Sequence, residues 1–196
     1  MTKLERLLAR VRECRICEGK LPNPPRPVLR AAASARVQIV GQAPGRRVHE
    51  TGIPWNDPSG DLLRLWLGIE RKVFYDARRI AIIPVGFCYP GKGASGDAPP
   101  RPECAPQWHP GLRALLPQLE LTLLAGQHAQ NTYLGARCKR TLAETVRAWP
   151  EYLPQFFPLP HPSPRNRRWL QNNPWFERDV LPEMRARFWA ALDDKR

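Results

Sequence analysis

The sequence predicts an α/β fold, a three-layer sandwich in which a short, mostly parallel central sheet lies between two layers of helices. Short apolar runs bounded by glycine and proline alternate along the chain with segments whose apolar residues recur at helical spacing. Strands that alternate with helices are joined by crossovers, which make neighbouring strands parallel. A chain of 196 residues suffices for one well-packed domain and is short for two, so we expect a single domain over residues 1–196.

Four apolar runs are the predicted strands. The first, residues 37–40, is rich in β-branched residues and leads into a turn that begins at Gly41. The second and third span residues 80–85 and 121–124. The fourth, residues 156–159, contains a proline, which is tolerated at an edge of a sheet. Ligands of parallel sheets bind at the carboxyl ends of the strands, so the loops after the first and last strands are the predicted binding region.

Helices are predicted where apolar residues recur every three or four positions. Asp57 or Ser59 can cap the second helix, and Gly68 ends it. Residues 89–102 hold four prolines and three glycines, a composition typical of a loop. The predicted helices span residues 3–11, 62–67, 112–119, 127–134 and 174–192.

The charge of the chain favours a polyanionic partner. Lys and Arg number 31 against 18 Asp and Glu, a formal net charge of +13. Such a field concentrates nucleic acid, although codon usage or solubility can also enrich arginine. Arginines gather at residues 46–47, 137–140 and 165–168. No apolar run approaches the roughly 18 residues of a membrane span, so we expect a soluble, cytoplasmic protein.

Four of the five cysteines have a spacing typical of a metal site. Cys14 and Cys17 can reach one metal from a single turn, and Cys88 and Cys104, with fifteen residues between them, would tie the centre of the chain to its start. Disulfides are less favoured because no secretory signal precedes the first pair, and free structural thiols are the alternative. Cys138 has no partner at a suitable spacing.

Three motifs carry a resemblance to a known family. The first predicted strand ends in Gly-Gln-Ala-Pro-Gly at residues 41–45, Thr-Gly-Ile-Pro-Trp follows at 51–55, and His-Pro-Ser-Pro-Arg-Asn occupies 161–166. In this order they resemble the signature motifs of the uracil-DNA glycosylase superfamily, over nearly the whole chain. The cysteine spacing and the Pro-Gly turn are similar to the iron–sulfur family 4 enzymes, and the last motif is closer to the single-strand-selective uracil glycosylases.

The resemblance implies a DNA-repair enzyme that flips uracil or a related deaminated base and cleaves its N-glycosidic bond, leaving an abasic site. The partner would be DNA that contains deaminated bases, and the protein a monomer. The resemblance also implies that the four cysteines hold a [4Fe-4S] cluster, with structural zinc as the alternative, since four thiolates serve either. The cluster's role would be structural, because base excision transfers no electron.

A glycosylase must hold the flipped base and stabilise the negative charge that it acquires on leaving. By the resemblance, Trp55 would stack on the base, worth roughly 1–3 kcal/mol. His161 would donate a hydrogen bond to the uracil oxygen, worth roughly 3 kcal/mol of the barrier. The alternatives are that Trp55 belongs to the core and that His161 is structural.

The turn after the first strand is the predicted base-binding segment. Gly41 lets the backbone approach the base closely, Gln42 would offer its backbone or amide to the base edge, and Ala43 lies beside them. Glu50 is the predicted water-activating residue, with the alternative that it pairs with a neighbouring arginine. His49, Asp57 and Asp61 are further candidates for this role.

The loop after His161 is the predicted DNA contact. Pro162, Ser163 and Pro164 would form a stiff loop that presses the DNA backbone, and Arg165 would enter the gap left by the flipped base or bind phosphate. Asn166 completes this loop. A plain surface charge is the alternative for Arg165.

Three positions depart from the family pattern. Gln42 replaces an acidic residue usual in family 4, Pro84 replaces an asparagine that reads uracil, and Ala43 stands where the most active branch has an aspartate. Base recognition must then come from backbone groups or another side chain. Two other interpretations stay open: a non-catalytic nucleic-acid-binding protein on the same fold, and a zinc-stapled nucleotide hydrolase.

Overall fold

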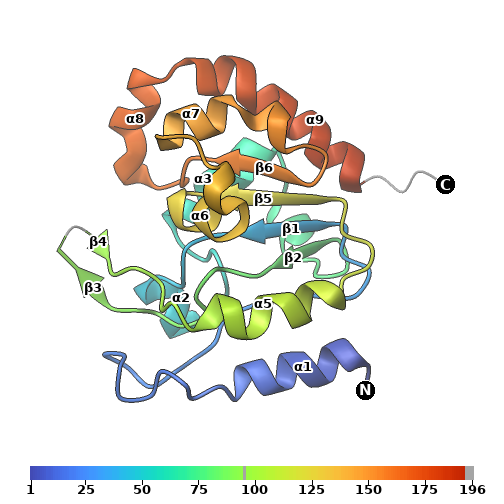
Figure 1. Cartoon of the computed structure of the whole chain (residues 1–196), viewed down its shortest axis with the longest axis vertical. Coiled ribbons are helices and arrows are strands. Elements are labelled where there is room, and N and C mark those ends of the chain that lie inside the picture. Colours follow the sequence, from blue (N-terminus) through green and yellow to red (C-terminus); the bar gives the residue numbers. More distant parts are fainter. Residues whose placement is uncertain (95, 193–196) are drawn as a thin grey trace.

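A computed structural model, which describes residues 1–94 and 96–192, confirms the α/β fold class. Four strands form one parallel sheet in the order β2-β1-β5-β6 (Figure 1). The strand with a proline, β6, lies at an edge as predicted. The strands are β1 (Val37–Val40), β2 (Ile80–Ile82), β5 (Leu121–Ala125) and β6 (Phe156–Leu159).

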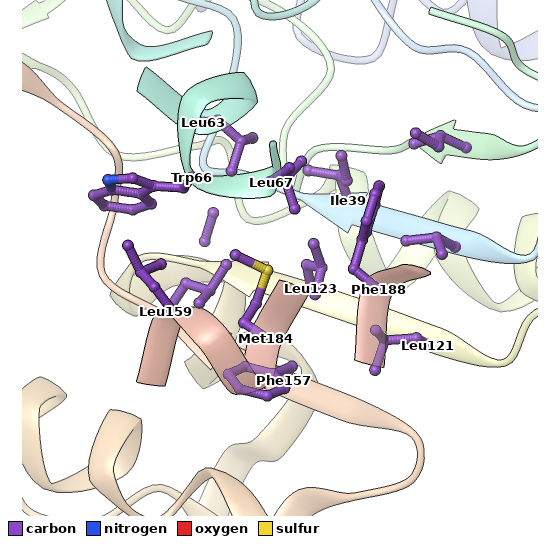
Figure 2. Packing of buried hydrophobic residues seen from close by; sticks show 14 of the residues in the cluster. Ile39, Leu63, Trp66, Leu67, Leu121, Leu123, Phe157, Leu159, Met184 and Phe188 are labelled. Atoms are coloured by element: carbon purple, nitrogen blue, oxygen red, sulfur yellow. The ribbon is translucent and has the colours of Figure 1, made fainter. Parts of the chain in front are cut away.

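One face of the sheet packs against α3 (Pro58–Leu67) and α9 (Leu181–Leu192). Figure 2 shows Leu63 and Leu67 of α3 and Met184 of α9 converging on the strands. Full burial of each large apolar side chain contributes about 1.5–3 kcal/mol, so this face is the main core. Alternate strand residues supply its floor: Val37, Ile39, Ile80, Ile82, Leu121, Leu123, Phe157 and Leu159.

The opposite face is covered by α1 (Lys3–Arg12), α5 (Cys104–Ala114) and α6 (Gln127–Leu134). The residues of the strands that alternate with those of the main core point to this side. Two of them are polar, Gln38 and Thr122, and both are fully buried. This second layer therefore buries polar groups as well as apolar ones.

The helices predicted over residues 3–11 and 127–134 agree with α1 and α6 within one residue, whereas α3 begins four residues before the predicted 62–67. Asp57 caps α3 by accepting the Gly60 N–H at 2.9 Å, and Gly68 ends the helix in the left-handed conformation. The apolar residues spaced four apart at the C-terminal end are all buried: Phe176, Val180, Met184, Phe188 and Leu192. They are carried by a π-helical turn (Phe176–Val180) and by α9.

The predicted helix over residues 112–119 is wrong in position. The helix α5 begins at Cys104 and ends before Leu115, and the leucines at 115, 116 and 119 lie in the turns that follow. Pro117 disfavours helical backbone at the residue before it, which stops the helix early. Pro106, in the first turn of α5, is tolerated because the N–H groups there have no helical partner.

Several short elements carry too few residues to show a period. They include a two-stranded hairpin inside the segment predicted as a loop, and the second strand is shorter than predicted, ending two residues before Pro84. No helix among the described residues is long and apolar enough to cross a membrane. The additional elements are α2 (Arg46–Thr51), α4 (Arg71–Phe74), β3 (Lys92–Gly93), β4 (Gly96–Asp97), α7 (Leu142–Arg147), α8 (Arg167–Asn172) and the 3-10 turns Gly135–Arg137, Trp149–Tyr152 and Pro164–Asn166.

Candidate active site

A pocket of about 600 Å³ opens where the parallel strands end. The chain leaves β1 at Gly41, β5 at Gly126 and β6 just before His161, which brings these distant segments to one edge of the sheet. The β3–β4 hairpin lies at the same end of the molecule (Figure 1). The lining includes residues 41–45, 54–55, 57–59, 84, 96–97, 161 and 163–166.

The turn at residues 41–45 forms one wall of the pocket, and hydrogen bonds hold it in place. The Val85 N–H donates to the Gly41 carbonyl at 2.9 Å, and the Gly86 N–H donates to the Gln42 carbonyl at 2.9 Å. The Gln42 side-chain nitrogen donates to the Ala98 carbonyl at 3.0 Å. Gln42 therefore bridges to the segment after the hairpin, and its side-chain oxygen is the part of the amide left for a ligand.

Trp55 lies in the pocket wall and is also packed into the core, with 9% of its surface exposed. Among the described non-glycine residues it alone has a positive φ, 55°. A Cβ on Gly41 would lie 2.6 Å from the Trp55 ring, and a Cβ on Gly60 would collide with the Trp55 carbonyl oxygen. The two glycines thus make room for an indole in a conformation that costs about 1–3 kcal/mol.

His161 stacks on the Trp55 indole, with ring centroids 5.6 Å apart and planes inclined by 29°. The Ser163 N–H and the Asn166 amide each donate to the His161 carbonyl at 2.8 Å, which fixes its backbone. Burial lowers the pKa of His161, with Asp57 opposing the shift and His128 adding to it. At neutral pH the imidazole is uncharged and carries one N–H that it can donate.

Two carboxylates line the pocket beside Gly45, those of Asp57 and Asp97. Asp57 uses one oxygen to cap α3, and its other oxygen lies 3.8 Å from the position that a Cβ on Gly45 would take. An Asp97 oxygen lies 3.3 Å from the same point. Burial raises the pKa of Asp97, Arg165 opposes this, and Asp57 adds to it. Asp97 was not found from the sequence, because it lies in a glycine- and proline-rich stretch without a motif.

Glu50, the predicted water-activating residue, does not line this pocket. Its carboxylate pairs with Arg46 at 2.9 Å on an exposed face of α2, because residues four apart on a helix are neighbours. It borders a second hollow of about 410 Å³ together with His49. Asp61 pairs with Arg64. Of the four residues considered for this role, Asp57 is the one that lines the main pocket.

The loop after His161 reaches the pocket with Ser163, Pro164, Arg165 and Asn166. Pro162 is buried and lies outside the lining, so it shapes the loop and offers little surface to DNA. Nη1 of Arg165 lies 2.6 Å from the position that a Cβ on Gly96 would take, which places its guanidinium against the hairpin. The loop and the hairpin therefore meet beside the pocket.

Two of the three basic clusters lie next to this pocket. The arginines at 46–47 follow the Gly45 turn, and those at 165–168 belong to or follow the His161 loop, and all of them are exposed. The third cluster is partly neutralised, since Lys139 pairs with Glu151 at 2.5 Å and Arg140 pairs with Glu144 at 3.5 Å. Arg46 likewise pairs with Glu50 at 2.9 Å, so the cluster at 46–47 is also partly neutralised, and exposed arginines remain beside the pocket for a polyanion.

The four cysteines of the predicted metal site come from three segments and carry no disulfide. Burial and the charges of the neighbouring cysteines raise the pKa of Cys88 to about 12 and that of Cys104 to about 11, so the four thiols lie within electrostatic reach of one another. Within the described ranges no three His, Cys, Asp or Glu side chains are close enough to hold one metal ion.

Comparison with known proteins identifies the family. The model of the uracil DNA glycosylase superfamily matches residues 30–185, most of the chain. The chain belongs to this superfamily. Enzymes of the superfamily act on DNA, in agreement with the basic surface around the pocket. The matched range contains the 41–45 turn, Trp55 and His161.

A solved structure is also similar to this glycosylase superfamily member. It is the solution structure of a candidate uracil DNA glycosylase from Methanosarcina acetivorans, with 17% sequence identity and a TM-score of 0.48. The similarity covers 82% of this chain and 97% of that one.

Proposed function

We propose that the protein is a DNA glycosylase that draws uracil or a related deaminated base into the 600 Å³ pocket and hydrolyses its N-glycosidic bond, leaving an abasic site. The observation that carries the proposal is that an uncharged His161 and the Asp57 carboxylate share one pocket at the strand ends. Cleavage of the bond makes the base negative and the sugar positive. His161 offers a hydrogen-bond donor to the base, and Asp57 offers a negative charge to the sugar.

His161 would act on the leaving base. As the bond to C1′ breaks, negative charge grows on the base oxygens, and a fixed N–H stabilises it most where water is excluded. An uncharged imidazole is suited to this role because it donates without first binding a proton from solution. Its stack on Trp55 and the two hydrogen bonds to its backbone carbonyl hold the ring in place before the base arrives.

Asp57 would act on the other side of the bond. One oxygen is committed to the α3 cap, so the side chain is held in a single orientation, and the other oxygen is available to orient a water toward C1′ or to stabilise positive charge on the sugar. This assigns to Asp57 the task for which Glu50 was predicted. It also supplies a carboxylate in a pocket whose first motif has Ala43 in place of an aspartate.

Base recognition would rest on Trp55, Gln42 and the turn that Gly41 begins. The Trp55 ring bounds the pocket beside His161, and the Gln42 side-chain oxygen can accept from a base N–H. Arg165 and its neighbours in the His161 loop would contact the DNA backbone, where phosphate contacts position the strand.

We also propose that Cys14, Cys17, Cys88 and Cys104 hold a [4Fe-4S] cluster. Support comes from the spacing of the four cysteines in the sequence and from the electrostatic coupling among their thiols, which helps to raise the pKa of Cys88 and of Cys104. A cluster places several atoms between its thiolates and so accepts a wider spacing than one zinc ion. When bound, it would cross-link the segment after α1 to the start of α5.

The proposal is tested with oligonucleotides that bear a single uracil, hypoxanthine or xanthine, incubated with the protein and then treated with alkali. Strand cleavage at the modified base, lost in His161→Ala while DNA affinity persists, is the expected result. Tight DNA binding without cleavage on any of the three would overturn it in favour of a binding protein on this fold, an alternative that Ala43 and Pro84 favour. Metal-dependent hydrolysis of free nucleotides would instead indicate a nucleotide hydrolase.

A further inference from the structure

A chain of buried polar side chains runs behind the pocket, between the sheet and the helices α5 and α6. Gln38 of β1 is fully buried there, with His109 of α5 and Tyr133 of α6 beside it. Burying polar groups costs free energy unless each finds a hydrogen-bond partner. Apolar residues at these positions would suffice to form a core, so this series of hydrogen-bonded polar side chains calls for an explanation.

The hydrogen bonds of this chain run in one direction. Arg113, which can only donate, bonds the Gln38 side-chain oxygen at 3.0 Å and thereby fixes the orientation of the amide. The Gln38 nitrogen then donates to the Tyr133 hydroxyl at 3.0 Å. The hydroxyl hydrogen is left for Nδ1 of His109, 2.8 Å away. The donor or acceptor role of each group is thus fixed by the group before it.

His109 ends the chain at the pocket wall. Since Nδ1 accepts from Tyr133, Nε2 carries the proton, and it donates to the Pro84 carbonyl at 3.0 Å. A carbonyl can only accept, so this assignment of the tautomer is the consistent one. Burial, with Arg113 adding to it, lowers the pKa of His109 to about 4, so the ring stays uncharged at neutral pH.

The series of hydrogen-bonded side chains meets the pocket at Pro84. Pro84 lines the pocket, and it has no N–H with which to join the sheet. Its neighbours are bound on both sides, Ile83 to the Ile39 carbonyl at 3.1 Å and Val85 to the Gly41 carbonyl at 2.9 Å. The bond from His109 to the Pro84 carbonyl is therefore the second anchor of the Pro84–Val85 peptide, whose N–H is held by Gly41.

We infer that His109 is a positioning residue for base selection: the chain Arg113–Gln38–Tyr133–His109 sets the place of Pro84 and with it the width of the base pocket. Pro84 offers no amide to read a base, so the selection that it exerts is by shape. The inference rests on the proposed function, because the pocket must take a base. A displacement of about 1 Å in a residue that lines an active site can lower the rate by two orders of magnitude. Hydrogen bonds that fix the position of Pro84 can therefore affect catalysis.

Tyr133→Phe tests the inference, because it removes the hydroxyl and keeps the ring and its packing. Tyr152→Phe is the matched control: Tyr152 is also buried and its hydroxyl donates to a backbone carbonyl, that of Arg137 at 2.9 Å, but it lies outside the pocket lining. We expect both variants to lose a similar amount of stability. Only Tyr133→Phe should lower kcat/KM, by about tenfold or more, and change the ratio of rates between uracil and the larger hypoxanthine. An unchanged ratio and rate would overturn the inference.

Two further measurements do not require turnover. Nitrogen-15 shifts of the His109 ring should report the uncharged Nε2–H tautomer in the wild type and a disturbed Nδ1 in Tyr133→Phe. The fluorescence of 2-aminopurine beside a uracil, which rises when that uracil leaves the stack, should show weaker capture in Tyr133→Phe than in Tyr152→Phe. A wild type that captures uracil without excising it would contradict the proposed function and leave the inference standing, whereas equal capture by both variants would overturn the inference.

Discussion

Asp57 shows how one side chain can serve the fold and the chemistry together. Its first oxygen satisfies a helix N–H, which explains its place in the sequence on structural grounds alone. Its second oxygen lies beside the Gly45 turn at the pocket, a position that depends on how α3 packs against that turn. The sequence predicted both the cap and a nearby carboxylate, but Glu50, Asp57 and Asp61 are too close along the chain for spacing alone to choose between them.

Asp57→Asn separates the two roles, since asparagine caps a helix as well as aspartate does but binds a proton poorly. We expect the rate of base excision to fall by about 10²–10⁴-fold, with a Tm close to that of the wild type. The measurement is single-turnover excision beside a thermal unfolding curve. Asp61→Asn is the control and should keep full activity, because Asp61 pairs with Arg64 and does not line the pocket. Equal losses in both variants would count against Asp57.

Gly126 leaves the space that the His161 side chain occupies. Its φ is +90°, and a Cβ there would lie 3.0 Å from the Cβ of His161. Gly126→Ala should therefore push His161 from its place and lower the excision rate at least tenfold. Gly135 also has a positive φ, +53°, with nothing within 4 Å of such a Cβ. Gly135→Ala should cost a similar 1–3 kcal/mol of backbone strain and leave the rate unchanged. Matched rates in the two variants would refute this account of Gly126.

At the scale of elements, prediction succeeded where a local pattern was long enough. The helix Gln127–Leu134 and the strand Phe156–Leu159 agree with the predicted bounds. The four-residue α4 and the two-residue strands of the hairpin show no period, and their positions depend on contacts with distant segments. For the same reason the motifs led to the 41–45 turn and His161, whereas Asp97 and the chain behind Pro84 required the structure.

The helix α5 makes the stability of the protein depend on pH through His109. The pKa of His109 is about 4 in the folded chain against 6.5 for an exposed histidine. Below pH 6.5 the unfolded chain therefore binds a proton at this residue that the folded chain does not bind until the pH is lower. Stability should fall by roughly 2–3 kcal/mol between pH 7 and pH 4.5 from this residue. Urea unfolding of the wild type and His109→Gln at both values measures it. The variant should show a smaller loss, and an identical loss would contradict the assignment.

For the whole molecule, the proposed cluster would link the first residues to the layer of helices behind the sheet. The segment that carries Cys14 and Cys17 lies outside the matched range 30–185, so the proposed cluster would attach an N-terminal addition to the shared fold. The sequence predicted this set from spacing alone. The choice between iron and zinc depends on bonding that spacing does not encode.

Cys14→Ser tests the proposed cluster. We expect the wild type to be brown and to contain iron and acid-labile sulfide, and the variant to lose all three. Loss of the cross-link should lower Tm by roughly 5–10 °C, about 2–3 kcal/mol for a chain of this size. Cys138→Ser is the control: Cys138 lies near Asn131, at 3.7 Å, and should leave iron content and Tm unchanged. Stoichiometric zinc without iron would contradict the cluster.

The release of a free base tests the central claim most directly. Purified protein is mixed with an oligonucleotide that carries one uracil. The masses of the products are measured by mass spectrometry, with no alkali treatment. Free uracil and an intact strand with one abasic site are predicted, with the rate at least about 10²-fold lower in His161→Ala. An oligonucleotide of unchanged mass after prolonged incubation with excess protein, for uracil, hypoxanthine and xanthine alike, would contradict the claim that this pocket excises bases.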